Sequence, residues 1–204
     1  AMLDGGWYKD LGRKDALMVT ASAGYGWTAN RMNSFHTGGW SRGKWTNRTL
    51  AATLNGKWSR RLSDVLAVDF NLGLEYTDVT QGSFTETGWD ARRFEKGHLK
   101  NLSLPVGVGL TCRSELKGRE WINSVAVSYL PDVYRENPSA PAQRLLNGYR
   151  WEARGTAPDR NAVRVNVNSA LQLNARWRAY AGYEFEGRNK AVAHRFNAGV
   201  SFAY

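Results

Sequence analysis

Alternation of apolar residues with polar or small ones is the pattern that most constrains this 204-residue chain. It recurs in eight segments, at residues 17–27, 50–58, 66–76, 102–110, 121–129, 163–173, 177–185 and 194–204. Side chains that repeat with period 2 lie on one face of a β-strand. None of the residues on the eight apolar faces is Asp, Glu, Lys or Arg, although 23% of the chain is charged. The sequence therefore predicts an all-β fold whose strands each carry one apolar face.

Composition excludes several classes of protein. Hydrophobic residues make up 42%, too many for a disordered chain, and the apolar runs are far shorter than the roughly 18 residues of a spanning helix. A single Cys excludes an internal disulfide and a thiolate zinc site. None of the three His residues is spaced i, i+4 from another. We therefore expect no metal, no cofactor and no enzymatic activity.

The alternation by itself fits a soluble barrel with an apolar interior as well as an outer-membrane barrel with an apolar exterior. The positions of the aromatic residues favour the membrane barrel, because they open or close the segments and so lie at opposite rims of an antiparallel meander. Membrane barrels carry aromatic girdles at both lipid–water interfaces. The predicted girdle residues are Trp27, Trp58, Tyr76, Trp121, Tyr129, Trp177 and Phe185.

The connections between segments alternate between long and short until the last one. Residues 28–49, 77–101 and 130–162 read as long loops, and residues 59–65, 111–120 and 174–176 as shorter connections. Outer-membrane barrels have short periplasmic turns and longer external loops. We therefore predict an antiparallel up-and-down transmembrane β-barrel over residues 16–204 in a bacterial outer membrane. Residues 1–15 are expected to be the end of an upstream strand or linker, and the chain the trailing part of a longer one.

The C-terminus carries a further pattern, in which Asn197, Gly199, Phe202 and Tyr204 read polar-x-Gly-x-x-aromatic-x-aromatic. This resembles the β-signal of bacterial outer-membrane proteins, which the outer-membrane barrel assembly machinery recognises. An unpaired strand with an apolar stripe can add to a sheet edge through main-chain hydrogen bonds. We therefore expect these four residues to form an assembly signal.

Several segments together resemble the β-domain (translocator) of type V autotransporters, and most closely the C-terminal barrel of the chlamydial polymorphic membrane protein group. The likeness is clear over residues 90–204 and rests mainly on pattern over residues 16–80. Its most specific piece is Pro131-Asp132-Val133-Tyr134-Arg135-Glu136-Asn137-Pro138. The other segments are Arg93-Phe94, residues 101–108, residues 159–165, residues 183–188 and the Phe202/Tyr204 terminus.

The resemblance implies a twelve-stranded barrel that anchors an N-terminal passenger and supports its export, with a linker helix threading the lumen. This chain would then hold the last eight strands, with part of another near residues 6–8. Eight strands alone also suffice to close a small barrel. The alternative interpretation is a small stand-alone outer-membrane barrel, adhesin or porin-like.

Charged residues on the faces opposite the apolar rows are predicted to line the lumen. Two roles remain open for them: lining a wet channel or gripping a linker helix, and pairing with one another so that they plug the bore. Self-cleavage by an acidic lumen residue is not expected, although Asp69 and Glu75 have suitable chemistry. The predicted lumen residues are Lys57, Asp69, Glu75, Arg164, Arg178, Glu184 and Arg195.

The net charge of +10 raises the question of a nucleic-acid partner. The basic residues instead cluster in predicted turns and loops, and not on one strand face. Such clusters suit anionic headgroups, so the expected partners are the lipid bilayer and lipopolysaccharide, not nucleic acid. The clusters are Arg42, Lys44 and Arg48; Arg60 and Arg61; and Arg92, Arg93 and Lys96.

Overall fold

The structure is a computed structural model that describes residues 1–36 and 38–203. Within these residues it contains strands and turns and no helix long and apolar enough to cross a membrane. The strands are β1 (Met2–Asp10), β2 (Asp15–His36), β3 (Gly39–Arg61), β4 (Leu66–Gln81), β5 (Phe84–Thr85), β6 (Thr87–Gly88), β7 (Arg92–Phe94), β8 (Gly97–Ser103), β9 (Val106–Leu116), β10 (Arg119–Arg144), β11 (Arg150–Arg154), β12 (Asn161–Gln172), β13 (Trp177–Arg188) and β14 (Ala191–Phe202).

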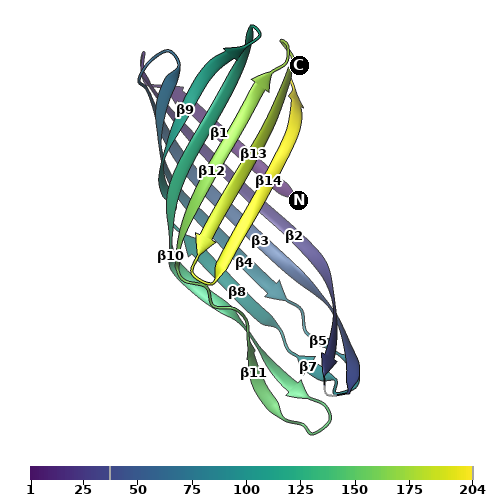
Figure 1. Cartoon of the computed structure of the whole chain (residues 1–204). Helices are drawn as coiled ribbons and strands as arrows, with labels where there is room; N and C mark the ends of the chain where they lie inside the picture. The colour runs from purple at the N-terminus through teal and green to yellow at the C-terminus, as the bar shows by residue number, and fades with distance from the viewer. Residues whose placement is uncertain (37, 204) are drawn as a thin grey trace.

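The strands form one curled antiparallel sheet in the order β1-β2-β3-β4-β8-β10-β12-β13-β14, and β9 continues the line of β8 between β4 and β10 (Figure 1). This sheet, here called the wall, holds the eight predicted segments, each in one strand or in the β8–β9 pair, except that residues 173 and 203 lie beyond the ends of β12 and β14. Residue 204 lies outside the described residues. The predicted all-β antiparallel meander is therefore confirmed. Residues 2–10 add a ninth strand, which pairs with β2 from Met2↔Gly24 to Asp10↔Ala16.

The wall is interrupted once, between β8 and β9, at Leu104-Pro105. Pro105 has no N–H to donate, so the hydrogen-bond ladder is interrupted at this position. The neighbouring strands satisfy the remaining groups: Gly73 N donates to Pro105 O at 2.8 Å, and Leu104 N donates to Pro131 O at 3.0 Å. The break therefore leaves these two groups paired with the neighbouring strands.

The two rims of the sheet differ. One rim has tight turns, such as Lys117-Gly118, where φ values of 52° and 73° fit the type I′ turn that matches strand twist. The opposite end extends into a region built from the far halves of β2, β3 and β10 together with β5, β6, β7 and β11 (Figure 1). A ring stack holds this extension together, with centroid distances of 4.6–6.3 Å. Its members, in spatial order, are Trp45, Phe84, Phe94, Trp151 and Tyr149.

The prediction of a long loop over residues 28–49 is wrong. Strands β2 and β3 stay paired in register from Trp27↔Arg48 to His36↔Gly39, so the hairpin is a ribbon that projects beyond the wall. Apolar alternation ends near residue 27, and the backbone pairing continues without it. The ribbon's inner face instead packs on the extension, where the Trp45 ring stacks on Phe84.

The long loop predicted over residues 130–162 is also largely strand. β10 runs on to Arg144, through the proline-containing segment 137–141, and pairs there with β11. The register shifts between Asp132 and Tyr134 and again between Glu136 and Ser139, and the second irregularity contains Pro138.

Candidate functional site

The two faces of the wall have opposite chemistry. Large apolar residues of the predicted outward rows are exposed, with Leu72 at 64% and Phe196 at 79% of their surface accessible. The buried positions are few, and among the described residues they include Ser103, Asp69 and Asp132. A soluble core would show the reverse, because burying apolar surface drives folding in water. The charged and polar side chains that are covered therefore lie on the inner face of the wall.

Arg164, on β12, forms the centre of an ion-pair network on this face. Its guanidinium donates to both oxygens of Glu75 on β4, at 2.7 and 3.0 Å, and to Glu186 Oε2 on β13 at 2.9 Å. Bidentate arginine–carboxylate pairs are geometrically specific and strong. Because β8, β9 and β10 lie between β4 and β12 in the sheet, the Arg164–Glu75 pair spans these strands on the inner face and links two strands that do not pair with each other.

The network continues from Glu186 to a second centre at Asp132. Arg188 Nε donates to Glu186 Oε1 at 3.0 Å and its Nη1 to Asp132 Oδ2 at 2.6 Å, while Arg135 Nη1 lies 3.1 Å from the same oxygen. Asp132 Oδ1 accepts from Ser103 Oγ at 2.6 Å. Both oxygens of this fully covered carboxylate thus have partners, which offsets the cost of removing it from water.

A separate group surrounds Asp69 on β4. Thr111 Oγ1 donates to Asp69 Oδ2 at 2.6 Å, Ser59 donates to Asp69 Oδ1, and Lys57 Nζ lies 4.0 Å from Oδ1. Both acidic residues considered for self-cleavage, Asp69 and Glu75, are therefore engaged with neighbouring side chains.

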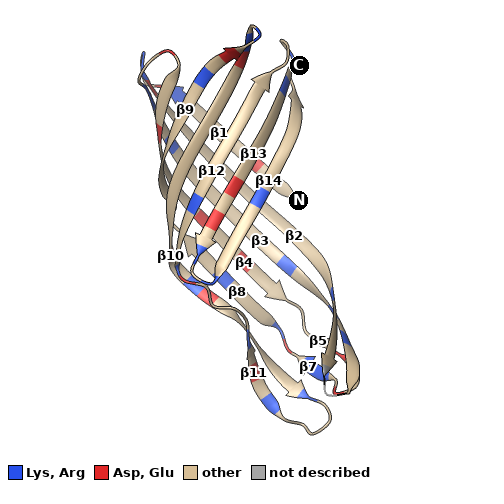
Figure 2. Ribbon diagram, viewed as in Figure 1, with Lys and Arg blue, Asp and Glu red and all other residues tan. Residues whose placement is uncertain are grey.

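The remaining predicted lumen residues lie nearer the free edge. Glu184 and Arg195 are a cross-strand pair and form an ion pair, with 60% of the Arg195 side chain exposed. Arg178 donates to Gln172 Oε1 at 2.9 Å. Figure 2 shows acidic and basic positions side by side on β12, β13 and β14, which matches these pairs. Glu184 also lies 3.8 Å from Arg164, and Arg195 lies 4.0 Å from Glu186, so both residues belong to the Arg164 network. Arg178 and the Lys57–Asp69 pair lie apart from that network.

Sequence reasoning missed Asp132, Arg135, Glu186 and Arg188 as lumen residues. All four lie in the segments that carried the family resemblance, so that likeness was the signal that pointed to them. Alternation also continues through Glu184, Glu186 and Arg188 on one face of β13. The sequence prediction ended that strand at residue 185, so Glu186 and Arg188 were not assigned to its inner face.

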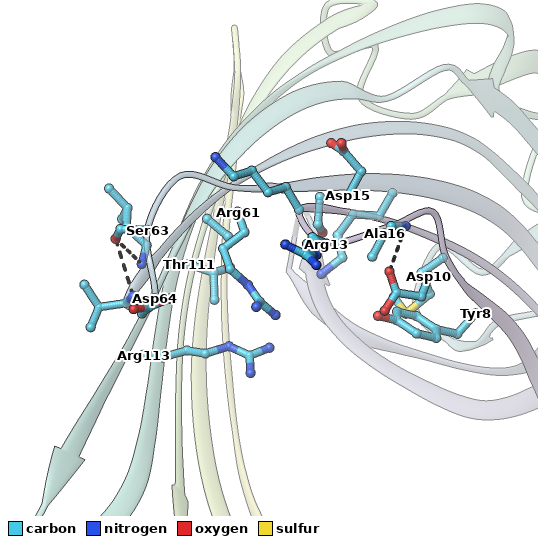
Figure 3. Close-up of a pocket in the computed structure, with 18 residues that line it drawn as sticks. Tyr8, Asp10, Arg13, Asp15, Ala16, Arg61, Ser63, Asp64, Thr111 and Arg113 are labelled. Carbon is cyan, nitrogen blue, oxygen red and sulfur yellow. Dashed lines mark hydrogen bonds between the residues drawn. The ribbon is translucent and has the colours of Figure 1, made fainter.

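A cavity of about 610 Å³ opens at the short-turn rim. In Figure 3 the guanidinium groups of Arg13, Arg61 and Arg113 point into it from the β1–β2 turn, β3 and β9. Arg113 Nη1 lies 3.7 Å from Oε1 of Glu120, a residue that does not line the cavity. The acidic residues that line the cavity are Asp10, Asp15 and Asp64. A smaller space of about 280 Å³ lies deeper, between Lys57, Asp69, Glu75 and Arg164.

The C-terminal strand β14 forms one end of the sheet order and pairs with β13 alone. Of the four predicted assembly residues, Asn197 and Gly199 lie on the inner face and Phe202 on the outer face against Trp177, with ring centroids 4.9 Å apart. Tyr204 lies outside the described residues. A Cβ on Gly199 would lie 2.6 Å from Tyr180 Cζ, so the tyrosine ring needs the glycine there.

The predicted girdle residues fall toward the two ends of the wall. Near the tight turns, Trp58 stacks on Phe70 at 5.2 Å and Trp121 Nε1 donates to Ser169 Oγ at 2.8 Å. Toward the extension, Tyr129 Oη donates to Asn161 Oδ1 at 2.6 Å. Tyr76, Trp27 and Phe185 lie in the corresponding halves of β4, β2 and β13. Trp121 and Tyr129 thus have hydrogen-bond partners for their polar atoms, one toward each end of the wall.

One prediction about charge is wrong. Arg42, Lys44 and Arg48 do lie on one strand face, the exposed face of β3, and Arg31 of β2 joins them. The alternation of exposed and covered residues along β3 places these side chains on the same side as Leu50.

The autotransporter β-domain family model matches residues 1–184 of this chain. The chain belongs to the autotransporter β-domain family. The probable outer membrane protein pmp19 of Chlamydia pneumoniae is 33% identical over 175 residues, which cover 81% of this chain and 18% of that protein. The probable outer membrane protein PmpC of Chlamydia muridarum is 32% identical over 133 residues, 64% of this chain and 9% of that protein.

Among solved structures, the translocator domain of the autotransporter NalP from Neisseria meningitidis matches with a TM-score of 0.43 and 15% identity. The match covers 100% of this chain and 79% of that domain. The chain spans about a fifth or less of the curated relatives it matches. The family match and the relatives named as outer membrane proteins place this autotransporter β-domain in the outer membrane, as the resemblance implied.

Proposed function

We propose that this β-domain anchors an N-terminal passenger in the outer membrane and supports its export to the cell surface. The single observation that supports this most is that the wall exposes apolar rows on its outer face and holds ion pairs on its inner face, the reverse of a soluble protein. In lipid every backbone polar group needs an internal partner, which a closed wall of strands provides. The polar face then lines the path along which the passenger chain crosses the membrane.

The tight-turn rim faces the periplasm in this proposal, and the extension of β5, β6, β7 and β11 faces outward. Short periplasmic turns and longer external segments are the rule for outer-membrane barrels. The cavity with Arg13, Arg61 and Arg113 is then the periplasmic mouth, through which the linker enters.

Upstream strands complete the wall. In the described part of the chain, β1 and β14 are the two ends of the sheet order, so each has an edge without a strand partner. Unpaired edges in lipid are costly. Three further strands before β1 would give the twelve that the resemblance implies, and a linker helix would then lie against the Arg164 network. The exposed β14 edge is the surface that the barrel assembly machinery would recognise.

The proposal is tested on the full-length protein in cells. An epitope tag placed upstream of residue 1 should be accessible to antibody on intact cells, and the protein should fractionate with the outer membrane. Deleting residues 200–204 should remove both signals, while replacing the turn residues 146–148 with Gly-Ser-Gly should preserve them. A tag that stays inaccessible on intact cells, with the β-domain folded in the membrane, would instead favour the stand-alone barrel.

A further inference from the structure

The outward face of the β2–β3 ribbon is the strongest unassigned feature of the molecule. Going away from the wall, its cross-strand pairs are Trp27↔Arg48, Ala29↔Thr46, Arg31↔Lys44, Asn33↔Arg42 and Phe35↔Trp40. Both Phe35 and Trp40 are 61% exposed, and their rings contact each other with centroids 5.5 Å apart. The face therefore carries four cations between an aromatic at the wall and an aromatic pair at the tip.

These cations form no salt bridge in the described part of the chain, and Asp78 of the neighbouring strand β4 lies diagonal to Arg48 without pairing with it. Within the described residues, no ion pair joins Arg31, Arg42, Lys44 or Arg48 to a carboxylate, in contrast to the paired arginines of the inner face. Arg31 and Lys44 lie directly opposite each other, and like charges in that position destabilise a strand pair. An anion between them would remove this repulsion.

The opposite face of the ribbon is occupied, so the basic face is the one that remains available. Ser41 and Gly43 are buried, and a Cβ on Gly43 would lie 2.8 Å from the Phe84 ring. The covered residues thus face the extension, and the cations face the side on which Leu50 and Leu54 are exposed. An occupant of the basic face must therefore be next to the lipid that surrounds the wall.

We propose that this face, Arg31, Arg42, Lys44 and Arg48, binds the anionic headgroup of a multiply phosphorylated glycolipid in the outer leaflet. The inference rests on the proposed function, because it requires the extension to face outward. From Arg42 to Arg48 the strand rises about 20 Å, whereas a phospholipid headgroup layer is only roughly 5–8 Å deep on each side. A row of cations of that length fits a large headgroup with several negative charges, and Phe35 and Trp40 offer flat surfaces for sugar rings above it.

The test uses the native-length protein, folded in detergent micelles and stripped of lipid, titrated with diphosphoryl lipid A and with the same lipid after removal of its phosphates. Diphosphoryl lipid A should bind more tightly. In the double variant Arg31→Gln/Lys44→Gln its affinity should fall roughly 10- to 30-fold, from about a fivefold loss for each cation. The matched control Arg60→Gln/Arg119→Gln removes the same charge from exposed positions at the other rim and should bind as the wild type does.

Equal affinity for the two lipids, or unchanged affinity in the ribbon variant, would overturn the proposal. So would full displacement of the lipid by inorganic phosphate at an equal phosphate concentration, which would mean a free-anion site. Surface display of the upstream tag is measured on the same variants. A ribbon variant that no longer displays the tag but still binds the lipid would assign the face to a passenger segment instead. Absence of tag display in the wild type would refute the proposed function alone.

Discussion

At the scale of single residues, position relative to the bilayer decides what a side chain contributes. Leu72 on the outer face contributes by remaining in hydrocarbon, and Arg164 on the inner face by joining β4 to β13 through Glu75 and Glu186. The same two residue types would exchange roles in a soluble protein. The effect of a substitution on stability therefore depends both on the face of the wall and on the depth in the bilayer.

Replacing Leu72 with Arg should reduce the free energy of unfolding in lipid vesicles by roughly 2–4 kcal/mol, because the charge would lie near the bilayer midplane. Leu62, in the turn between β3 and β4, is 54% exposed and gives the matched control. Its change to Arg should cost at most about 1 kcal/mol, as at an interface. Equal costs at the two positions would contradict the outward assignment of Leu72.

A double-mutant cycle on Arg164→Gln and Glu75→Gln should give a coupling energy of roughly 1–3 kcal/mol, below the 3–5 kcal/mol lost when a fully buried pair is broken. The side chains are 16% and 25% exposed, so water reduces the effect. The pair Arg154–Glu152, whose side chains are 76% and 49% exposed, serves as the comparison and should show a much smaller coupling. Denaturant unfolding in vesicles measures both cycles, and similar couplings would show that the lumen is as wet as the surface.

At the scale of elements, alternation predicted the strands of the wall because each of them passes through lipid. A strand in lipid needs an apolar outer face. Beyond the bilayer an apolar outer face is no longer required, so Arg31, Arg42 and Lys44 lie on the outer face while β2 and β3 remain paired. The apolar pattern therefore ended before the strands did. The ion-pair network was only partly predictable, since Arg164 meets Glu75 through the curl of the sheet, which no local pattern encodes.

The extension should depend on its ring stack. Changing Phe94 to Ala removes the ring between Phe84 and Trp151, so β7 should lose its packing against β5 and β11. Limited proteolysis should then cut within residues 82–96 while the wall keeps its heat-modifiable mobility on gels. Tyr149→Ala, at the exposed end of the stack, is the control and should leave the cleavage pattern nearly unchanged.

The β14 edge should be essential for assembly. Removing residues 202–204 takes away the ring that packs on Trp177 and shortens the strand. We expect loss of the folded, heat-modifiable form in outer-membrane fractions, while a protein shortened by deletion of Leu146 in the β10–β11 turn should still assemble. Normal membrane insertion of the truncated protein would refute the assembly-signal hypothesis.

At the scale of the whole molecule, the account depends on a wall that is apolar outside and polar inside. Lipid accessibility of single cysteines tests this most directly. In a Cys112→Ser background, adjacent positions 71 and 72 on β4 are each changed to Cys, spin-labelled and reconstituted in vesicles. The label at 72 should respond to oxygen dissolved in lipid, and the label at 71 to a water-soluble nickel complex. The reverse assignment, with 71 in lipid and 72 in water, would contradict the account.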